Sequence, residues 1–140
     1  MHENFYHNVK VYYEDTDAGG VVYYANYLKY LERARTEALS TIGLSNLQIK
    51  DKFGALIIVK SCNIKYKKSA FLEDELTIRS FIKSVTKTSF FMNQIITQDK
   101  DVIVESEIHL VFINDKGKPV KVPQIIFDNF KPYFCDSIKL

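Results

Sequence analysis

The chain has 140 residues, a formal net charge of +2 and 46% hydrophobic residues. A single domain over residues 1–140 is expected, because a chain of this length can bury about two-thirds of its unfolded surface. The small net charge argues against a nucleic-acid partner, and the absence of any run of about 20 apolar residues argues against an integral membrane segment. The N-terminal MHENFYHNVK lacks the basic and apolar parts of a secretory signal, so a cytoplasmic location is expected.

The first predicted strand ends in an acidic bend. Val9, Val11 and Tyr13 recur at every second position, which is typical of a strand that ends near residue 13. Three carboxylates then fall within residues 14–17, and Gly19-Gly20 follows as a bend in which backbone amides can lie open. The bend therefore brings carboxylates close to the start of the next element.

A long amphipathic helix is predicted next. Asn26 fits its N-cap, the helix runs over about residues 27–42, and Gly43 fits the position just after its end. Seven apolar residues recur at helical spacing: Tyr27, Leu28, Leu31, Ala34, Ala38, Leu39 and Ile42. This stripe must be covered by something large.

The rest of the chain predicts mainly strands. Residues 44–52 are predicted as a connector with one helical turn, and residues 55–66 as a long strand in which Cys62 is a buried structural thiol. Strands at residues 76–83, 88–97 and 102–113 follow with short turns, so they are antiparallel neighbours. Pro123 then opens a helix over residues 124–130. The pattern predicts an α+β fold in which an antiparallel sheet wraps one long helix.

Residues 12–37, YYEDTDAGGVVYYANYLKYLERARTE, resemble a known family signature. The acidic pair, Asp-Ala-Gly, Val-Val-Tyr, the Asn-Tyr at the helix start and Glu-Arg-Ala-Arg are similar to the hotdog-fold acyl-CoA thioesterases of the 4-hydroxybenzoyl-CoA thioesterase family. The similarity is densest to the Tol-Pal-associated branch, and the order of strands continues it to about Ile113. The resemblance implies a hotdog fold and an enzyme that hydrolyses the thioester of a small acyl-CoA, short-chain or aromatic.

The resemblance assigns the chemistry to the acidic bend and the helix start. Asp17 matches the carboxylate that serves as general base or nucleophile in similar enzymes. The amides near Asn26, with Tyr24 and the bend at Gly20, are expected to polarise the substrate carbonyl. Without the resemblance, residues 14–17 would be interpreted as a solvated turn.

One position departs from the Tol-Pal-associated branch, in which the second residue after Val-Val is typically His. Here Tyr24 stands in its place. A phenol with an unperturbed pKa near 10 is a poor proton carrier at neutral pH, so Tyr24 is expected to act through its backbone amide and the packing of its ring.

For coenzyme A, the resemblance points to residues 84–90, where Lys87 would meet the nucleotide phosphates; a solvated lysine in a β-turn is the alternative. Lys65, in the basic cluster with Lys67 and Lys68, is assigned to the same role, although a solvated strand end is the alternative for this cluster. No metal or prosthetic group is expected, because the three histidines are scattered and coenzyme A enters only as part of the substrate.

Self-association into a homodimer or tetramer is expected, because the strand aromatics exceed what one helix can cover: Tyr66, Phe81, Phe90, Phe91 and Phe112. A monomer with scattered surface aromatics is the alternative. The alternative function is a non-catalytic hotdog module that binds an acyl carrier protein or a cell-envelope partner. Acyl length and the choice between coenzyme A and an acyl carrier protein are left open by the sequence.

Overall fold

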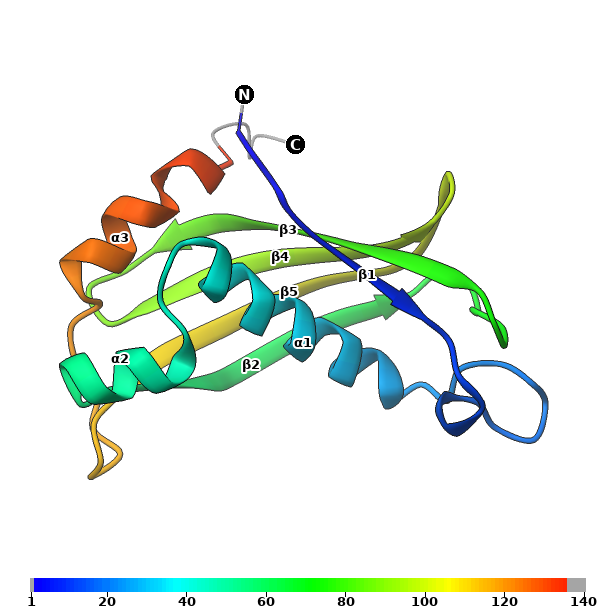
Figure 1. Cartoon of the computed structure of the whole chain (residues 1–140), viewed down its shortest axis with the longest axis horizontal. Helices are drawn as coiled ribbons and strands as arrows, with labels where there is room; N and C mark the ends of the chain where they lie inside the picture. The colour runs from blue at the N-terminus through cyan, green and yellow to red at the C-terminus, as the bar shows by residue number, and fades with distance from the viewer. Residues whose placement is uncertain (1, 136–140) are drawn as a thin grey trace.

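The computed structural model describes residues 2–135, which form one antiparallel sheet covered by helices (Figure 1). The sheet has five strands in the order β1-β3-β4-β5-β2, namely β1 (Phe5–Lys10), β3 (Glu75–Val85), β4 (Ser89–Gln98), β5 (Asp101–Ile113) and β2 (Leu56–Tyr66). The long helix α1 (Asn26–Thr41) lies across one face, while α2 (Asn46–Phe53) and α3 (Gln124–Phe130) lie toward one end. The predicted α+β fold is confirmed.

Helix α1 ends as its sequence predicts. Gly43 has φ +93°, a conformation that costs glycine little because it has no Cβ. The Gly43 N–H donates to the Ser40 carbonyl (3.0 Å) and the Leu44 N–H to the Leu39 carbonyl (3.1 Å), which is the Schellman arrangement. The chain turns sharply there and enters α2.

The core lies between α1 and the sheet, and it contains a buried polar group. Gln94 of β4 is 0% exposed and donates to the Leu31 carbonyl of α1 (3.0 Å) and to the Ser80 hydroxyl of β3 (3.1 Å). Its side-chain oxygen accepts a hydrogen bond from Arg35 (3.0 Å). Because every polar atom of this side chain is paired, Gln94 fixes how α1 sits on the sheet at little cost in desolvation.

Two element predictions are wrong. The first strand ends at Lys10, and residues Tyr13–Asp15 form a 3₁₀ turn, η1, because the Asp15 carboxylate accepts the Tyr12 N–H (2.9 Å). The connector after α1 is a full helix, α2, because Ser45 caps it and Gln48 completes a reciprocal capping box.

Two burial predictions also need correction. Cys62 is exposed, because β2 is an edge strand and none of its residues is buried. Phe81, Phe90 and Phe112 are all buried within the chain, and the Phe90 ring packs 5.0 Å from the ring of Phe130 on α3. These three aromatics therefore give no argument for self-association, whereas the exposed strand β2 does. Among the described residues, no helix is long and apolar enough to cross a membrane.

The Tyr27 hydroxyl provides a test of the packing of α1 against the loop before β3. It accepts the N–H of Ala70 (3.0 Å), and the two residues are 3% and 0% exposed. Because Tyr27→Phe leaves this buried N–H unpaired, we expect the free energy of unfolding to fall by about 1–3 kcal/mol in urea titrations. The matched change Tyr6→Phe, at a site 65% exposed, should stay within about 0.5 kcal/mol. Equal losses in the two variants would contradict the assignment.

Candidate active site

The acidic bend folds into a small hairpin that precedes α1. The Asp17 N–H donates to the Val21 carbonyl (2.9 Å), and the Tyr23 N–H donates to the Asp15 carbonyl (2.9 Å). An isolated bridge between Thr16 and Val22 lies between these bonds. The leg that carries Asp17 is thereby fixed against the leg that leads into the helix.

Asp17 sits at the tip of this hairpin with one carboxylate oxygen unbonded. Its Oδ1 accepts the Gly19 N–H (2.8 Å), and its carbonyl accepts the Gly20 N–H (3.0 Å). A Cβ at position 19 would lie 3.3 Å from Oδ1, and Gly20 has φ +80°, so both glycines suit this turn. Among the described residues nothing bonds Oδ2, and Asp17 is exposed. The turn orients the carboxylate and leaves one oxygen available.

The helix start is tied to the hairpin by Asn26. Its side-chain amide donates to the Asp15 carbonyl (2.8 Å), which also accepts the Tyr23 N–H. Asn26 is the first helical residue, whereas the N-cap is Ala25, which makes no side-chain capping bond. The prediction of Asn26 as the N-cap is therefore wrong by one position, because the helix already includes Asn26 and its side chain is directed to the loop instead.

Two backbone donors are left open at the helix start. The Asn26 N–H donates to the Tyr23 carbonyl (2.8 Å) and the Tyr27 N–H to the Tyr24 carbonyl (3.3 Å). The N–H groups of Tyr24 and Ala25 have no acceptor within residues 2–135. They lie at the positive end of a helix of 16 residues, where the dipole favours an anion or a polarised oxygen. These donors can hold the carbonyl oxygen of a substrate.

Aromatic rings form a wall beside these donors. The Tyr66 ring of β2 lies 6.1 Å from the Tyr24 ring and 5.7 Å from the Tyr27 ring. Tyr24 and Tyr66 are 60% and 44% exposed. Burial raises the pKa of Tyr66 above its ordinary value of 10.0, so the phenol is fully neutral at physiological pH. The sequence did not single out Tyr66 for this role, because contacts between separate elements leave no local pattern.

Tyr30 lies beneath the hairpin. It is 1% exposed, and its hydroxyl lies near the Asp15 carboxylate, the one described side chain that interacts with it as a hydrogen-bond partner, outside ordinary bonding distance. Burial raises the pKa of Tyr30 strongly, and the nearby Asp15 carboxylate raises it further. The side chain thus stays neutral under the loop that carries Asp17.

The two predicted coenzyme lysines occupy different places. Lys65 lies near the end of β2, where Tyr66 contacts the helix start, but on the opposite face of the sheet from Tyr66. The turn between β3 and β4, which carries Lys87, lies at the opposite end of the sheet from the loop between β1 and α1, which carries Asp17 (Figure 1). One chain therefore does not bring Lys87 to Asp17. Within residues 2–135, no three His, Cys, Asp or Glu side chains gather closely enough to hold a metal ion.

Comparison with known proteins identifies the family. The model of the "Thioesterase-like superfamily" matches residues 11–130, which include the hairpin, α1 and all but one strand of the sheet. The chain belongs to this superfamily. The resemblance to hotdog thioesterases is confirmed, and with it the hotdog fold and the enzyme class, a thioester hydrolase.

Relatives of this thioesterase match over most of their length. The "Acyl-CoA thioester hydrolase YbgC" of Escherichia coli O6:H1 is 38% identical over 125 residues, 88% of this chain and 92% of that protein. The "Acyl-CoA thioesterase YbgC" of Haemophilus influenzae is 34% identical over 83% of this chain and 86% of its own. A probable thioesterase from Bartonella henselae superimposes with a TM-score of 0.83 at 31% identity, covering 86% of this chain and all of that one.

The burial of Tyr30 predicts how the thioesterase responds to alkaline pH. Because its pKa in the folded state lies above the ordinary 10.0, the folded form keeps the proton at a pH where the unfolded form has begun to release it. The contribution to stability is therefore complete below pH 10 and is lost as the pH rises above that value. Urea titrations at pH 8.5 and 10.5 should show a smaller loss of unfolding free energy in Tyr30→Phe than in the wild type. An unchanged loss would contradict the assignment.

Proposed function

We propose that this thioesterase hydrolyses the thioester of a small acyl-CoA at the junction of the acidic hairpin and α1. The observation that carries the proposal is that the hairpin before α1 holds both an unbonded Asp17 oxygen and the two open N–H groups of Tyr24 and Ala25. A carboxylate and a pair of amide donors are the two components that acyl transfer requires. The names of the E. coli and H. influenzae relatives support acyl-CoA as the substrate.

In the proposed reaction the amides of Tyr24 and Ala25 hold the thioester carbonyl oxygen as negative charge develops on it. Asp17 acts as general base by taking a proton from water, and the resulting hydroxide attacks the carbonyl carbon. The carbon–sulfur bond then breaks, and the proton that Asp17 took from water passes to the sulfur, so the coenzyme leaves as a thiol. As a nucleophile, Asp17 would instead attack the carbonyl carbon and release the coenzyme thiolate, which takes a proton from water, and the resulting anhydride is then hydrolysed to the free acid and the Asp17 carboxylate. Either course uses no metal or prosthetic group.

The remaining residues of the hairpin position these groups. Asn26 and the Tyr23 N–H hold the Asp15 carbonyl, and this contact fixes the hairpin against the helix. The Gly20 N–H closes the turn at Asp17, so we assign Gly20 to the shape of the turn. The Tyr24 ring and Tyr66 form a wall that suits a short or flat acyl group.

The proposed assembly is a homodimer or a tetramer. Lys87 can reach the coenzyme phosphates only at the site of another subunit, because it lies at the far end of its own sheet. Lys65 is retained as a second phosphate contact. The same site would accept an acyl group on an acyl carrier protein, which ends in the same pantetheine thiol. We place the enzyme in the cytoplasm, where free thiols such as Cys62 persist.

Asp17→Asn tests the reaction directly. We expect thiol release from a short-chain acyl-CoA to fall by at least about a hundredfold, the lower range for loss of a general base. Tyr24→Phe is the matched control, since it keeps the backbone amide and the ring, and it should retain most of kcat. Near-normal turnover by Asp17→Asn would remove this carboxylate from the mechanism. A loss in Tyr24→Phe as large as in Asp17→Asn would show that the phenol takes part in the chemistry.

Lys87→Ala tests the coenzyme contact. Because an exposed lysine binds phosphate mainly by charge, KM for acyl-CoA should rise with little change in kcat, and the wild-type KM should rise with salt. Lys100→Ala, in the exposed turn between β4 and β5, serves as the control and should leave KM unchanged. Equal KM values for acyl-CoA and a truncated acyl-pantetheine would contradict the assignment.

A further inference from the structure

The hairpin that carries Asp17 is joined by a third segment, which comes from the loop between β2 and β3. An isolated antiparallel bridge pairs Val21 of the hairpin with Phe71 of this loop. Beside the bridge, the Leu72 N–H donates to the Gly20 carbonyl (3.2 Å). The two loops lie at the same end of the main sheet (Figure 1). Three short segments thus form a small antiparallel sheet next to the reacting carboxylate.

The pairing determines which side chains share a face of this small sheet. Residues opposite each other in an antiparallel pair point to the same face, and neighbours along one strand point to opposite faces. Val22 and Ala70 form the face toward the core, because they are 5% and 0% exposed and the Val22 N–H donates to the Ala70 carbonyl (2.8 Å). Asp17 lies opposite Val21, and Val21 opposite Phe71, so these three residues form the outer face. We call it the Asp17 face.

Phe71 presents an aromatic ring to water on the Asp17 face, from a backbone that is held in place. The residue is 52% exposed. Its N–H donates to the Asp74 carboxylate (2.8 Å), and its carbonyl accepts the Asp74 N–H (3.0 Å). A large apolar side chain on a fixed turn can pack against a substrate with little loss of conformational entropy.

The geometry of the thioester determines which part of the substrate reaches this face. With the carbonyl oxygen at the Tyr24 and Ala25 amides, the acyl group and the sulfur leave the carbonyl carbon in different directions. Tyr24 and Tyr66 form the wall for the acyl group, so the sulfur and the arm attached to it lie on the side of Asp17. The arm ends in charged phosphates that must stay in water, and the Asp17 face is open to water.

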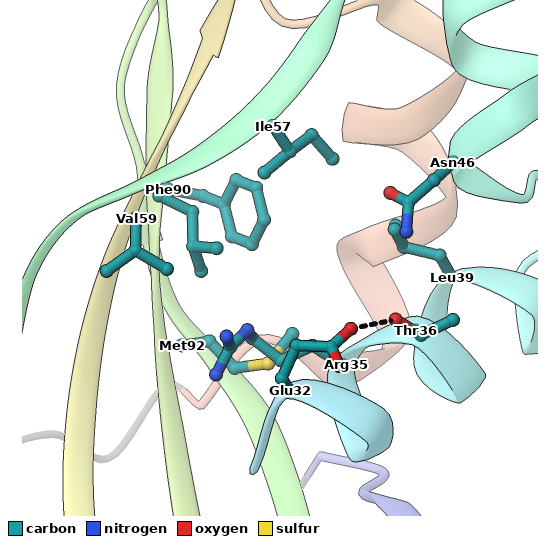
Figure 2. A pocket seen from close by; sticks show the side chains of 10 residues that line it. Glu32, Arg35, Thr36, Leu39, Asn46, Ile57, Val59, Phe90 and Met92 are labelled. Carbon is teal, nitrogen blue, oxygen red and sulfur yellow. Dashed lines mark hydrogen bonds between the residues drawn. The ribbon is translucent and has the colours of Figure 1, made fainter. Parts of the chain in front are cut away.

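The pocket beside α1 does not offer the arm another route. Figure 2 shows this pocket of about 160 Å³, with Leu39 on the helix and Ile57 on β2 among the residues that line it. Glu32 is the first helix residue that lines the pocket, so about 10 Å of helix separates it from Ala25. The pocket therefore does not border the reacting carbonyl.

We propose that Phe71, with Val21 beside it, binds the pantetheine arm of the thioester. The Asp17 face then recognises the carrier of the acyl group, whereas the wall of Tyr24 and Tyr66 contacts the acyl group itself. This inference rests on the proposed function and deepens it by assigning a further substrate contact. Coenzyme A and an acyl carrier protein carry the same arm, so the contact serves either carrier.

Strand spacing indicates which part of the arm meets the ring. Adjacent strands lie about 4.8 Å apart, so two spacings put Phe71 about 10 Å from Asp17. An extended chain advances about 1.2 Å per bond, so the dimethyl-substituted carbon of pantetheine lies about 12 Å from the sulfur, whereas N-acetylcysteamine ends at about 6 Å. Phe71 therefore packs against the distal, branched part of pantetheine, which a truncated thioester lacks.

Phe71→Ala, assayed with three thioesters of one acyl group, tests the contact. KM should rise at least about threefold for acyl-CoA and for acyl-pantetheine, and it should stay unchanged for acyl-N-acetylcysteamine, whose chain ends before the ring. We expect little change in kcat, because the ring touches neither the bond that forms nor the bond that breaks. Phe71→Tyr keeps the ring and should keep the wild-type KM values.

Two further variants serve as controls. Phe53→Ala removes a phenylalanine that is 43% exposed on α2, and it should leave all three KM values unchanged. Lys87→Ala should raise KM for acyl-CoA alone, because only acyl-CoA carries the nucleotide phosphates. An acyl carrier protein thioester, if it is turned over, should show the same rise in Phe71→Ala as acyl-CoA, whereas turnover of acyl-CoA alone would assign the arm to the coenzyme.

Three results would overturn the inference. An equal rise in KM for all three thioesters would place the effect of Phe71 at the carbonyl rather than along the arm. A rise that depends on acyl length and not on the carrier would assign the ring to the acyl group. A lower subunit mass of Phe71→Ala in light scattering would show that the ring packs against another subunit.

The same measurements separate the inference from the proposed function. Wild-type protein that releases no thiol from any of the three thioesters would remove the proposed function. Normal turnover by the wild type, with the same KM values in Phe71→Ala as in the wild type, would overturn the inference alone.

Discussion

The backbone carbonyl of Asp15 is the point on which the site depends. It accepts two hydrogen bonds, from the Tyr23 N–H and from the side chain of Asn26, and these join the acidic hairpin to the first residue of α1. The helix begins at Asn26 without a side-chain cap, and the amides of Tyr24 and Ala25 just before it stay open. The contact at Asp15 therefore positions the carboxylate loop beside the open donors.

Polar contacts at two further places hold the helix itself. Gln94 of β4 bonds to the Leu31 carbonyl and to Arg35, and the Tyr27 hydroxyl bonds to the loop at Ala70. Hydrophobic packing is largely non-directional, so it would allow α1 to slide along the sheet. Paired polar groups at two points along the helix fix its register. The position of the Tyr24 and Ala25 amides is in this way determined by contacts in the core.

The sequence predicted the helices, strands and turns that are determined by residues close together in the chain. The amphipathic stripe located α1, Gly43 located its end, and alternation located four of the five strands closely. The family signature located the hairpin of Asp17. Each of these signals acts within a few residues of the structure that it forms, so single-chain reasoning can detect it.

The sequence did not predict burial and side-chain contacts that depend on distant parts of the chain. Cys62 has the alternation of a buried strand residue, yet it is exposed because its strand lies at the edge of the sheet. The alternation of residues within one strand does not reveal the position of that strand in the sheet. Asn26 has the chemistry of a cap, but it is the first residue of the helix, and its side chain donates to a carbonyl 11 residues away. The assignment of Lys87 to coenzyme A stays a prediction, and the structure adds only that the length of β3 separates it from Asp17 of the same chain. Tyr66 escaped notice for the same reason, because its contact with the Tyr24 ring joins β2 to the helix start, and 41 positions of sequence separate the two strand and helix segments that meet there.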